Sequence, residues 1–151
     1  MKRKTILLIS ACIIALSPLS AISQTGLNIN RIFTDSFRGK KGVTETVLNH
    51  KKLKSKYPLS LYHSLTITGH PDLASEIEPL LTADGAKAKN KEVRYKSGRL
   101  YYCLYCLNST RAGQSRYILY LNGHLNGDNK IILLYLEGEA TIEEVKKMLN
   151  K

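Results

Sequence analysis

Three polar residues that could do chemistry lie within ten positions of the sequence, in and just after a predicted strand. His63 interrupts an otherwise apolar strand face, and His70 and Asp72 follow shortly after it. An imidazole beside a carboxylate can act as a general acid or base, because the pKa of histidine lies near neutral pH. One hypothesis is therefore a small hydrolase-like enzyme with a pocket formed by these three residues. The alternative is structural: His63 is a core histidine with a backbone or tyrosine partner, and His70 to Asp72 begins a helix.

The sequence lacks other common arrangements of catalytic and cofactor-binding residues. There is no G-x-S-x-G elbow, no Walker loop, no dinucleotide-binding glycine fingerprint and no EF-hand spacing. The histidines are scattered, and the cysteines have no second pair of metal ligands. We therefore assign no catalytic residue, expect no cofactor or metal site, and favour a protein that is not an enzyme.

Cys103 and Cys106 form a C-x-x-C pair, the spacing found in disulfide oxidoreductases and in halves of metal sites. The pair lies in an aromatic and apolar run, residues 100–107, that predicts a strand. In a strand, residues three apart point to opposite faces, and their Cα atoms are about 10 Å apart. A disulfide needs Cα atoms within about 7 Å. We therefore expect two separate, reduced thiols.

Tyrosines supply most of the aromatic side chains, and six of them fall in adjacent predicted strands. These are Tyr101, Tyr102, Tyr105, Tyr117, Tyr120 and Tyr135. Packing within the sheet explains such positions, but one face could instead present several rings to a glycan or peptide. On this second interpretation the candidate ligand-binding residues are His63, His70, Asp72, Tyr101, Tyr117 and Tyr120.

The chain is strongly basic, with 23 Lys and Arg against 12 Asp and Glu and a formal net charge of +11. Clusters of positive charge favour polyanionic partners, although they also occur on ordinary solvated surfaces. The candidate polyanion-binding residues are Lys51, Lys52, Lys54, Lys56, Lys87, Lys89 and Arg94.

Residues 1–23 have the pattern of a cleaved secretory signal peptide. Met1–Lys4 is basic, residues 5–19 are mostly apolar, and Ala21 and Ser23 place small residues before a cut at Gln24. The alternatives are lipidation at Cys12 and an uncleaved anchor, but the apolar stretch is shorter than the ~20 residues of a membrane span. Cleavage removes three basic residues and leaves a formal charge of +8. We expect one domain over residues 24–151.

The rest of the chain predicts an α+β fold. Alternation is clearest over 59–67, where Leu59, Leu61, His63, Leu65 and Ile67 share one strand face. Further strands are predicted at 43–48, 92–96, 99–107, 115–121 and 130–137, and helices near 29–37, 73–81 and 142–149. We expect a mainly antiparallel sheet of about five to six strands, with two to three helices packed on one face.

Three local signals refine this expectation. Ser97-Gly98 fits a tight hairpin turn between two strands. Thr141 and Glu144 form a capping box at the start of the last helix. Pro79 predicts that the middle segment forms either two short helices or one helix that begins near Glu78.

The leader and several strand patterns resemble a group of small exported Bacteroidetes proteins that are filed as domains of unknown function. The segments that carry the resemblance are residues 27–33, 40–44, 62–66, 116–120 and 133–138. It spans nearly all of the chain after the leader, through patterns of low specificity. The resemblance implies a periplasmic or surface location in a Gram-negative cell and brings no catalytic residues.

The favoured hypothesis is an exported, non-enzymatic domain that binds an envelope protein, a glycan or another polyanion through a basic or tyrosine-bearing sheet surface. The alternatives are the His63 enzyme and a polyanion-binding domain that uses the clustered lysines. Nucleic acid is not expected as a partner, because export separates the protein from it. We expect no transmembrane span after cleavage, and a location in the periplasm or outside the cell, including at the outer membrane.

Overall fold

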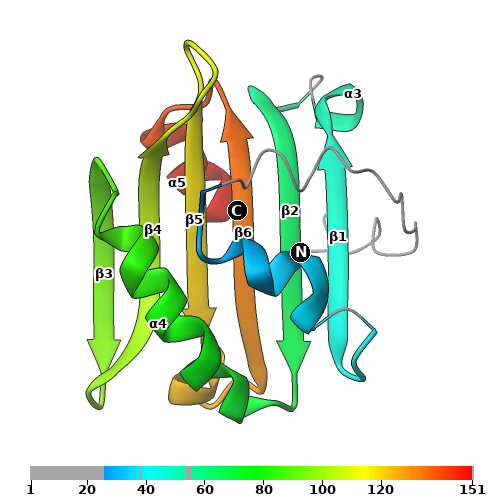
Figure 1. Cartoon of the computed structure of the whole chain (residues 1–151), viewed down its shortest axis with the longest axis vertical. Coiled ribbons are helices and arrows are strands. Elements are labelled where there is room, and N and C mark those ends of the chain that lie inside the picture. Colours follow the sequence, from blue (N-terminus) through cyan, green and yellow to red (C-terminus); the bar gives the residue numbers. More distant parts are fainter. Residues whose placement is uncertain (1–25, 38, 54–55, 151) are drawn as a thin grey trace.

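A six-stranded antiparallel sheet forms the centre of the molecule (Figure 1). The structure is a computed structural model that describes residues 26–37, 39–53 and 56–150. The leader predicted at residues 1–23 lies outside this part. The strand order is β1-β2-β6-β5-β4-β3. The strands are β1 (Val43–Asn49), β2 (Leu59–Thr68), β3 (Asn90–Lys96), β4 (Arg99–Asn108), β5 (Ser115–Asn122) and β6 (Lys130–Gly138). The predicted α+β class is therefore confirmed.

Helices and helical turns connect the strands and cover the sheet. The helices are α3 (His50–Leu53), α4 (Ala74–Gly85) and α5 (Ile142–Leu149). A π-helical turn spans Ile32–Ser36, and 3-10 turns span Pro71–Leu73 and Gly123–Asn126. The capping box is present, since Glu144 N donates to Thr141 Oγ1 at 3.3 Å and Thr141 N donates to Glu144 Oε2 at 2.7 Å.

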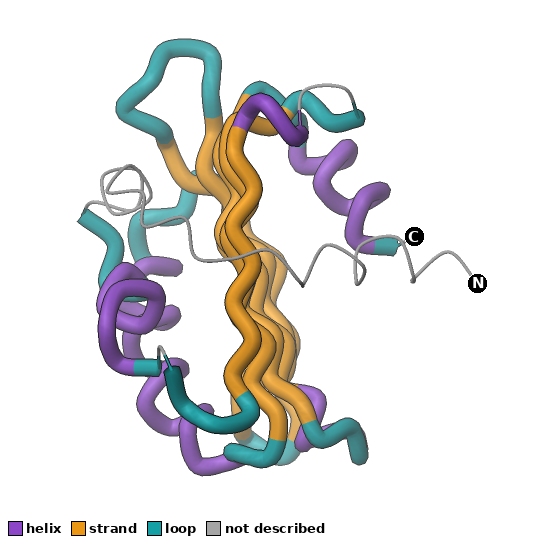
Figure 2. The backbone as a smooth tube through the Cα atoms, turned by 90° about the vertical axis from the view of Figure 1, so that its right-hand side faces the viewer, coloured by secondary structure: helices purple, strands orange, loops and turns teal. Residues whose placement is uncertain are grey.

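The helices lie on both faces of the sheet, not on one face as predicted (Figure 2). On the α4 face, α4 and the segment from Leu27 to Phe37 pack on the sheet. On the α5 face, α3 and α5 pack on it. The physical reason is that β6 is apolar on both sides: residues 133–136 are all buried, so each face needs its own cover.

Strand β2 follows the predicted alternation except at its first residue. Leu61, His63, Leu65 and Ile67 face the α4 side, whereas Leu59 packs in the core of the α5 face. A shift in the pairing of β2 with β6 between Leu59 and Leu61 moves Leu59 across the sheet. With one extra residue between them, side chains on the two sides of such an irregularity no longer alternate as in a regular strand. The alternation in the sequence alone did not reveal this shift.

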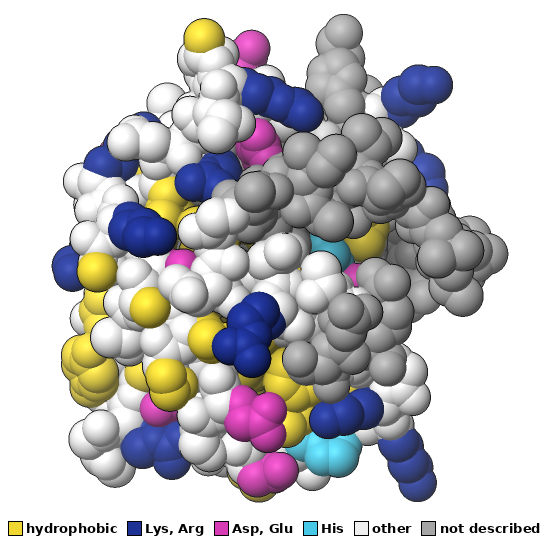
Figure 3. Space-filling model, in the orientation of Figure 1, with side chains coloured by type: hydrophobic (Ala, Val, Ile, Leu, Met, Phe, Trp, Pro, Cys, Tyr) yellow, Lys and Arg dark blue, Asp and Glu magenta, His cyan; other side chains and the backbone are white. Residues whose placement is uncertain are grey.

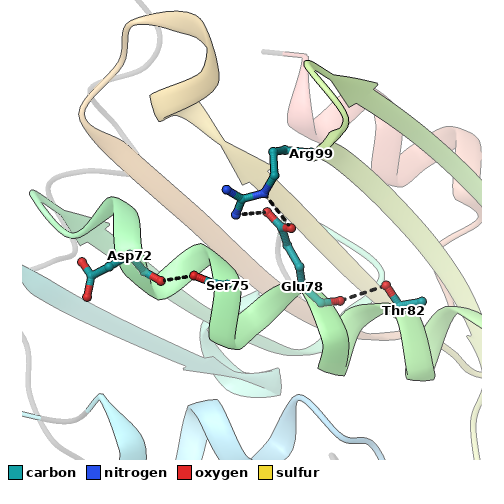
Figure 4. A network of polar contacts seen from close by, with 5 residues as sticks. All are labelled: Asp72, Ser75, Glu78, Thr82 and Arg99. Atoms are coloured by element: carbon teal, nitrogen blue, oxygen red, sulfur yellow. Dashed lines mark hydrogen bonds and ion pairs between the residues drawn. The ribbon is translucent and has the colours of Figure 1, made fainter.

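Helix α4 runs through Pro79 without a break, so both predictions for this segment were wrong. A proline inside a helix removes one backbone hydrogen bond to the residue four positions earlier. Here Pro79 is exposed, while Ile77 and Leu81 are fully buried on either side of it. Packing of these side chains on the sheet stabilises the helix that the local sequence disfavours. Glu78 adds a two-point ion pair with Arg99 of β4, at 3.0 and 3.2 Å (Figure 4).

Asp84 at the end of α4 holds the N-terminal segment against the sheet. Its carboxylate is fully buried and accepts the backbone N–H of Asn28 at 2.7 Å and of Ile29 at 2.9 Å. The side-chain amide of Asn28 donates to the same carboxylate at 2.9 Å. Three donors thus satisfy one buried carboxylate, which is the condition for burying it without a large penalty.

We expect Asp84→Ala to lower the free energy of unfolding by about 2–4 kcal/mol, because it leaves buried N–H groups without an acceptor. Urea denaturation followed by circular dichroism measures this change. The exposed Asp72 provides the control, since Asp72→Ala loses only a helix-dipole contribution of less than about 1 kcal/mol. Equal stability losses in the two variants would contradict the anchoring role.

Candidate functional site

His63 lies in the core of the α4 face and is paired with a carboxylate. Its side chain is almost fully buried, and its Nε2 lies 2.6 Å from Oε1 of Glu45 on the neighbouring strand β1. The His63 ring also packs on Phe33, with 4.3 Å between ring centroids. Across the sheet, His63 is the direct neighbour of Tyr135 on β6. The partner of His63 is therefore Glu45, a residue that sequence reasoning missed although it lies in a predicted strand.

His70 and Asp72 do not join this pair. The end of β2 at Thr68 lies roughly 16 Å from His63 along the strand, at about 3.3 Å per residue, and both residues follow it. His70 Nε2 lies 2.8 Å from the backbone oxygen of Lys41. Asp72 is exposed, and its backbone carbonyl accepts a hydrogen bond from Ser75 Oγ at 2.7 Å (Figure 4). His70 is the residue before the 3-10 turn and makes no side-chain cap bond to it, while Asp72 lies in its first turn, so both lie at the start of the helical segment as in the structural alternative.

A second buried polar group centres on Glu137, near the end of β6. Its carboxylate accepts the Tyr135 hydroxyl at 3.0 Å and Ser109 Oγ at 3.1 Å. Arg116 is its direct cross-strand neighbour on β5. Burial, and then the charge of Glu137, raise the pKa of Tyr135 well above its usual value, so this hydroxyl stays protonated. In the sequence, the signal for this group was a single acidic residue at the end of an apolar strand. The hydrogen bonds from Tyr135 and Ser109 satisfy the Glu137 carboxylate, which indicates a structural role.

The tyrosines do not form one exposed face. Tyr117 and Tyr120 are buried on opposite sides of the sheet, and the Tyr117 hydroxyl donates to the backbone oxygen of Ala140 at 2.5 Å. The Tyr120 hydroxyl is buried and has no hydrogen-bond partner in the described part of the chain. Of the three candidate tyrosines, Tyr101 alone is partly exposed.

The predicted basic residues lie at opposite edges of the sheet. Lys51 and Lys52 belong to α3, beside β1 and β2, while Lys54 lies outside the described residues. Lys87 and Lys89 follow α4, and the Lys89 backbone N–H donates to Cys106 of β4 at 3.0 Å. Five strand spacings separate the two edges, about 24 Å. On the α4 face, Lys and Arg side chains are scattered and do not form one patch (Figure 3). These residues therefore do not make one continuous surface.

Cations and aromatic rings come together at the edge formed by β3 and β4. The Arg94 guanidinium lies 5.1 Å from the ring centre of Tyr102, and Lys96 Nζ lies 5.9 Å from that of Tyr101. Both distances are typical of cation–π contacts. Tyr95 lies between the two cations in sequence and is 69% exposed. It points to the other side of the edge strand from Arg94, because it pairs with Leu100 of the α4-face core, whereas Arg94 pairs with Tyr102 on the α5 face. We call these five residues the edge patch: Arg94, Tyr95, Lys96, Tyr101 and Tyr102.

The hairpin between β3 and β4 explains this arrangement. Ser97 and Gly98 both have positive φ, 51° and 74°, as a tight two-residue hairpin turn requires, so the predicted turn is confirmed. The pairing shifts between Arg94 and Tyr95, where Tyr102 pairs with Arg94 and Leu100 pairs with Tyr95. The additional residue, Tyr101, changes the direction in which the neighbouring side chains point. The sequence had indicated Arg94 and Tyr101 as candidate binding residues and Lys96 as part of a basic run, but not that they lie together.

A groove of about 200 Å³ adjoins the edge patch on the α5 face. We call it the edge groove; it is lined by Glu92, Arg94, Tyr102, Lys146, Leu149 and Asn150. Glu92 Oε1 binds Arg94 at 2.5 Å, and Glu92 Oε2 binds Lys146 of α5 at 3.2 Å. Hydrogen bonds from Arg94 and Lys146 lower the pKa of Glu92. One carboxylate thus holds two cations from different elements at the groove.

Cys103 and Cys106 are free and buried, and they pack on opposite faces of the sheet. Burial raises the pKa of the Cys103 thiol to about 12. The thiolate is the reactive form of cysteine, and at pH 8 such a thiol is ionised to only about one part in ten thousand.

We expect Cys103 to resist alkylation in the folded protein at pH 8, because it is both buried and protonated. Iodoacetamide labelling followed by peptide mass spectrometry measures the modification. The same peptide from urea-denatured protein is the control and is expected to be fully labelled. Rapid labelling of Cys103 in the folded state would contradict this description of its environment.

The His63–Glu45 pair permits a second stability test. We expect His63→Ala to cost about 2–4 kcal/mol of unfolding free energy, because it removes both the packing on Phe33 and the contact of the buried imidazole with Glu45. His70→Ala is the control and is expected to cost about 1 kcal/mol, since it loses one exposed hydrogen bond. Urea denaturation measures both. Unchanged stability of His63→Ala would show that the pair is not structural.

In the ranges that the structure describes, no helix is long and apolar enough to cross a membrane, and no group of three or more His, Cys, Asp and Glu side chains could hold a metal ion.

Comparisons with known proteins place the chain in a family. No curated protein and no solved structure shows significant similarity to the chain. Residues 16–149 match the family of unknown function DUF6108, which covers nearly the whole chain. The chain therefore belongs to the DUF6108 family.

Proposed function

We propose that this protein is exported and acts as a non-enzymatic binding domain for an anionic glycan of the cell envelope. The pattern of the leader and the resemblance to exported Bacteroidetes proteins support the location. The observation that carries the binding role is the edge patch, in which two cations contact two tyrosine rings on an edge strand that also carries the exposed Tyr95.

The patch combines two kinds of contact that an anionic glycan needs. Arg94 and Lys96 offer positive charge to carboxylate, sulfate or phosphate groups. Tyr95 offers a large amphipathic surface at low cost in conformational entropy, and exposed Tyr and Arg are typical of binding surfaces. Because the rings of Tyr101 and Tyr102 hold the two cations, less side-chain freedom is lost on binding.

A second candidate function is acid–base catalysis by the His63–Glu45 pair. The observation in its favour is the 2.6 Å contact between the imidazole and a carboxylate whose side chain is 24% exposed. A carboxylate in this position can orient a catalytic imidazole. The almost complete burial of His63 favours the structural role, and the stability of His63→Ala distinguishes the two.

The binding proposal is tested with heparin as a model polyanion and neutral dextran as its uncharged counterpart. We expect heparin to bind in isothermal titration calorimetry and dextran not to bind. The double variant Arg94→Ala/Lys96→Ala is expected to lose about thirtyfold in affinity, because each of the two contacts with an anionic group contributes about 1 kcal/mol.

The double variant Lys51→Ala/Lys52→Ala is the matched control. It removes the same charge at the opposite edge of the sheet, so we expect less than about a twofold loss. Tyr95→Ala removes no charge and is expected to weaken binding about threefold to tenfold. Equal losses in the two double variants would show that net charge, and not the edge patch, drives the binding.

A further inference from the structure

We infer that the edge groove is a binding site for one oxyanion group of a sugar, a carboxylate or a phosphate. This inference rests on the proposed function and deepens it: the edge patch would contact the glycan along its length, and the groove would select an acidic sugar. Its basis is the meeting of Arg94, Lys146 and Tyr102 around a space of about 200 Å³.

The two cations of the groove retain free hydrogen-bond donors. A guanidinium has five N–H donors and an ammonium has three, whereas the contacts with Glu92 use one nitrogen of Arg94 and the single nitrogen of Lys146. Both side chains are accessible to a ligand, since Arg94 is 64% exposed and Lys146 is 45% exposed. The groups Arg94, Lys146 and Glu92 together have a formal charge of +1, so an incoming oxyanion would neutralise the site.

Glu92 places the cations before a ligand arrives. Each of its oxygens holds one cation, and the two cations come from elements that are distant in sequence, β3 and α5. Arg94 is also held by its contact with the Tyr102 ring. Such preorganisation reduces the entropy that the side chains lose on binding.

Tyr102 and Leu149 complete the chemistry of the groove. Burial and the charge of Glu92 raise the pKa of Tyr102, so its hydroxyl remains a hydrogen-bond donor at neutral pH. Leu149 supplies an apolar wall suited to the carbon face of a sugar ring. The volume lies below the ~300 Å³ at which pockets for larger ligands begin, which indicates a site for one sugar unit.

The structural alternative is that Glu92 and its two cations only attach α5 to β3. The two interpretations differ for Glu92→Gln. If the role is only structural, this variant loses stability and gains no ligand affinity. If the groove binds an oxyanion, Glu92→Gln raises the formal charge of the site from +1 to +2. We expect this gain in charge to outweigh the loss of preorganisation, so that affinity for the oxyanion rises by about threefold to tenfold.

The test is an NMR titration of the ¹⁵N-labelled protein with glucuronate, glucose 6-phosphate and uncharged glucose. We expect glucuronate and the phosphate to shift the amide signals of the groove residues, and glucose to leave them unchanged. The stronger of the two charged sugars identifies the preferred oxyanion. Equal shifts with glucose, or no shift with either charged sugar, would overturn the inference.

Two neighbouring lysines on α5 give a matched comparison. Lys146 lines the groove, whereas the exposed Lys147 is not among its lining residues. We expect Lys146→Ala to weaken glucuronate or phosphate binding about fivefold to tenfold and Lys147→Ala to change it less than about twofold. Lys146→Gln retains more of the stem and tests the charge if Lys146→Ala is unstable. Equal effects at positions 146 and 147 would contradict a site in the groove.

Failure of this inference can be distinguished from failure of the proposed function. If Lys96→Ala weakens heparin binding and Lys146→Ala affects neither ligand, the edge patch binds the glycan and the groove does not. If the charged sugars bind in the groove while heparin does not bind at all, the proposed role of the edge patch is wrong.

Discussion

The fold depends on the burial of both faces of the sheet. Leu133, Leu134, Tyr135 and Leu136 of β6 are all buried, although consecutive side chains point to opposite faces. A sheet with apolar groups on both faces needs a cover on each, because exposed apolar surface is costly. Helix α4 and the N-terminal segment cover one face, and α3 and α5 cover the other (Figure 2).

The need to cover both faces also determines which polar side chains are buried and which remain accessible. Where the central strands are buried, polar groups such as Glu137 and Asp84 have several hydrogen-bond partners and act within the structure. At the β3 edge, side chains remain exposed and retain free donors. Because α5 must lie on its face of the sheet, Lys146 comes close to Glu92 of β3. The edge groove is thus a consequence of how the second face is covered.

The large numbers of basic residues and tyrosines suggest one basic or aromatic surface, but the described side chains do not form one. The basic residues are divided between opposite edges, and Tyr117 and Tyr120 are used in the core. A smaller set at one edge, Arg94 to Lys96 with Tyr101 and Tyr102, brings the two chemistries into contact. The candidate binding surface follows from a single hairpin and an irregularity in its pairing.

Local features of the fold could be predicted from the sequence because neighbouring residues determine them. The alternation from Leu61 to Ile67, the turn at Ser97-Gly98 and the capping box at Thr141 and Glu144 are of this kind, and they were sufficient for the α+β class. Pro79 and Leu59 were misjudged, since tertiary packing maintains α4 through the proline and a pairing shift moves Leu59.

By itself the sequence determined the type of fold, the geometry that separates Cys103 from Cys106, and the basic character of the chain. Only the tertiary structure decided that Glu45 is the partner of His63, that the helices divide between two faces, and that Lys146 lies beside Glu92. The physical reason is separation along the chain. Periodicity and turn preferences act over a few residues, whereas these pairings depend on strand order and on which face each helix covers.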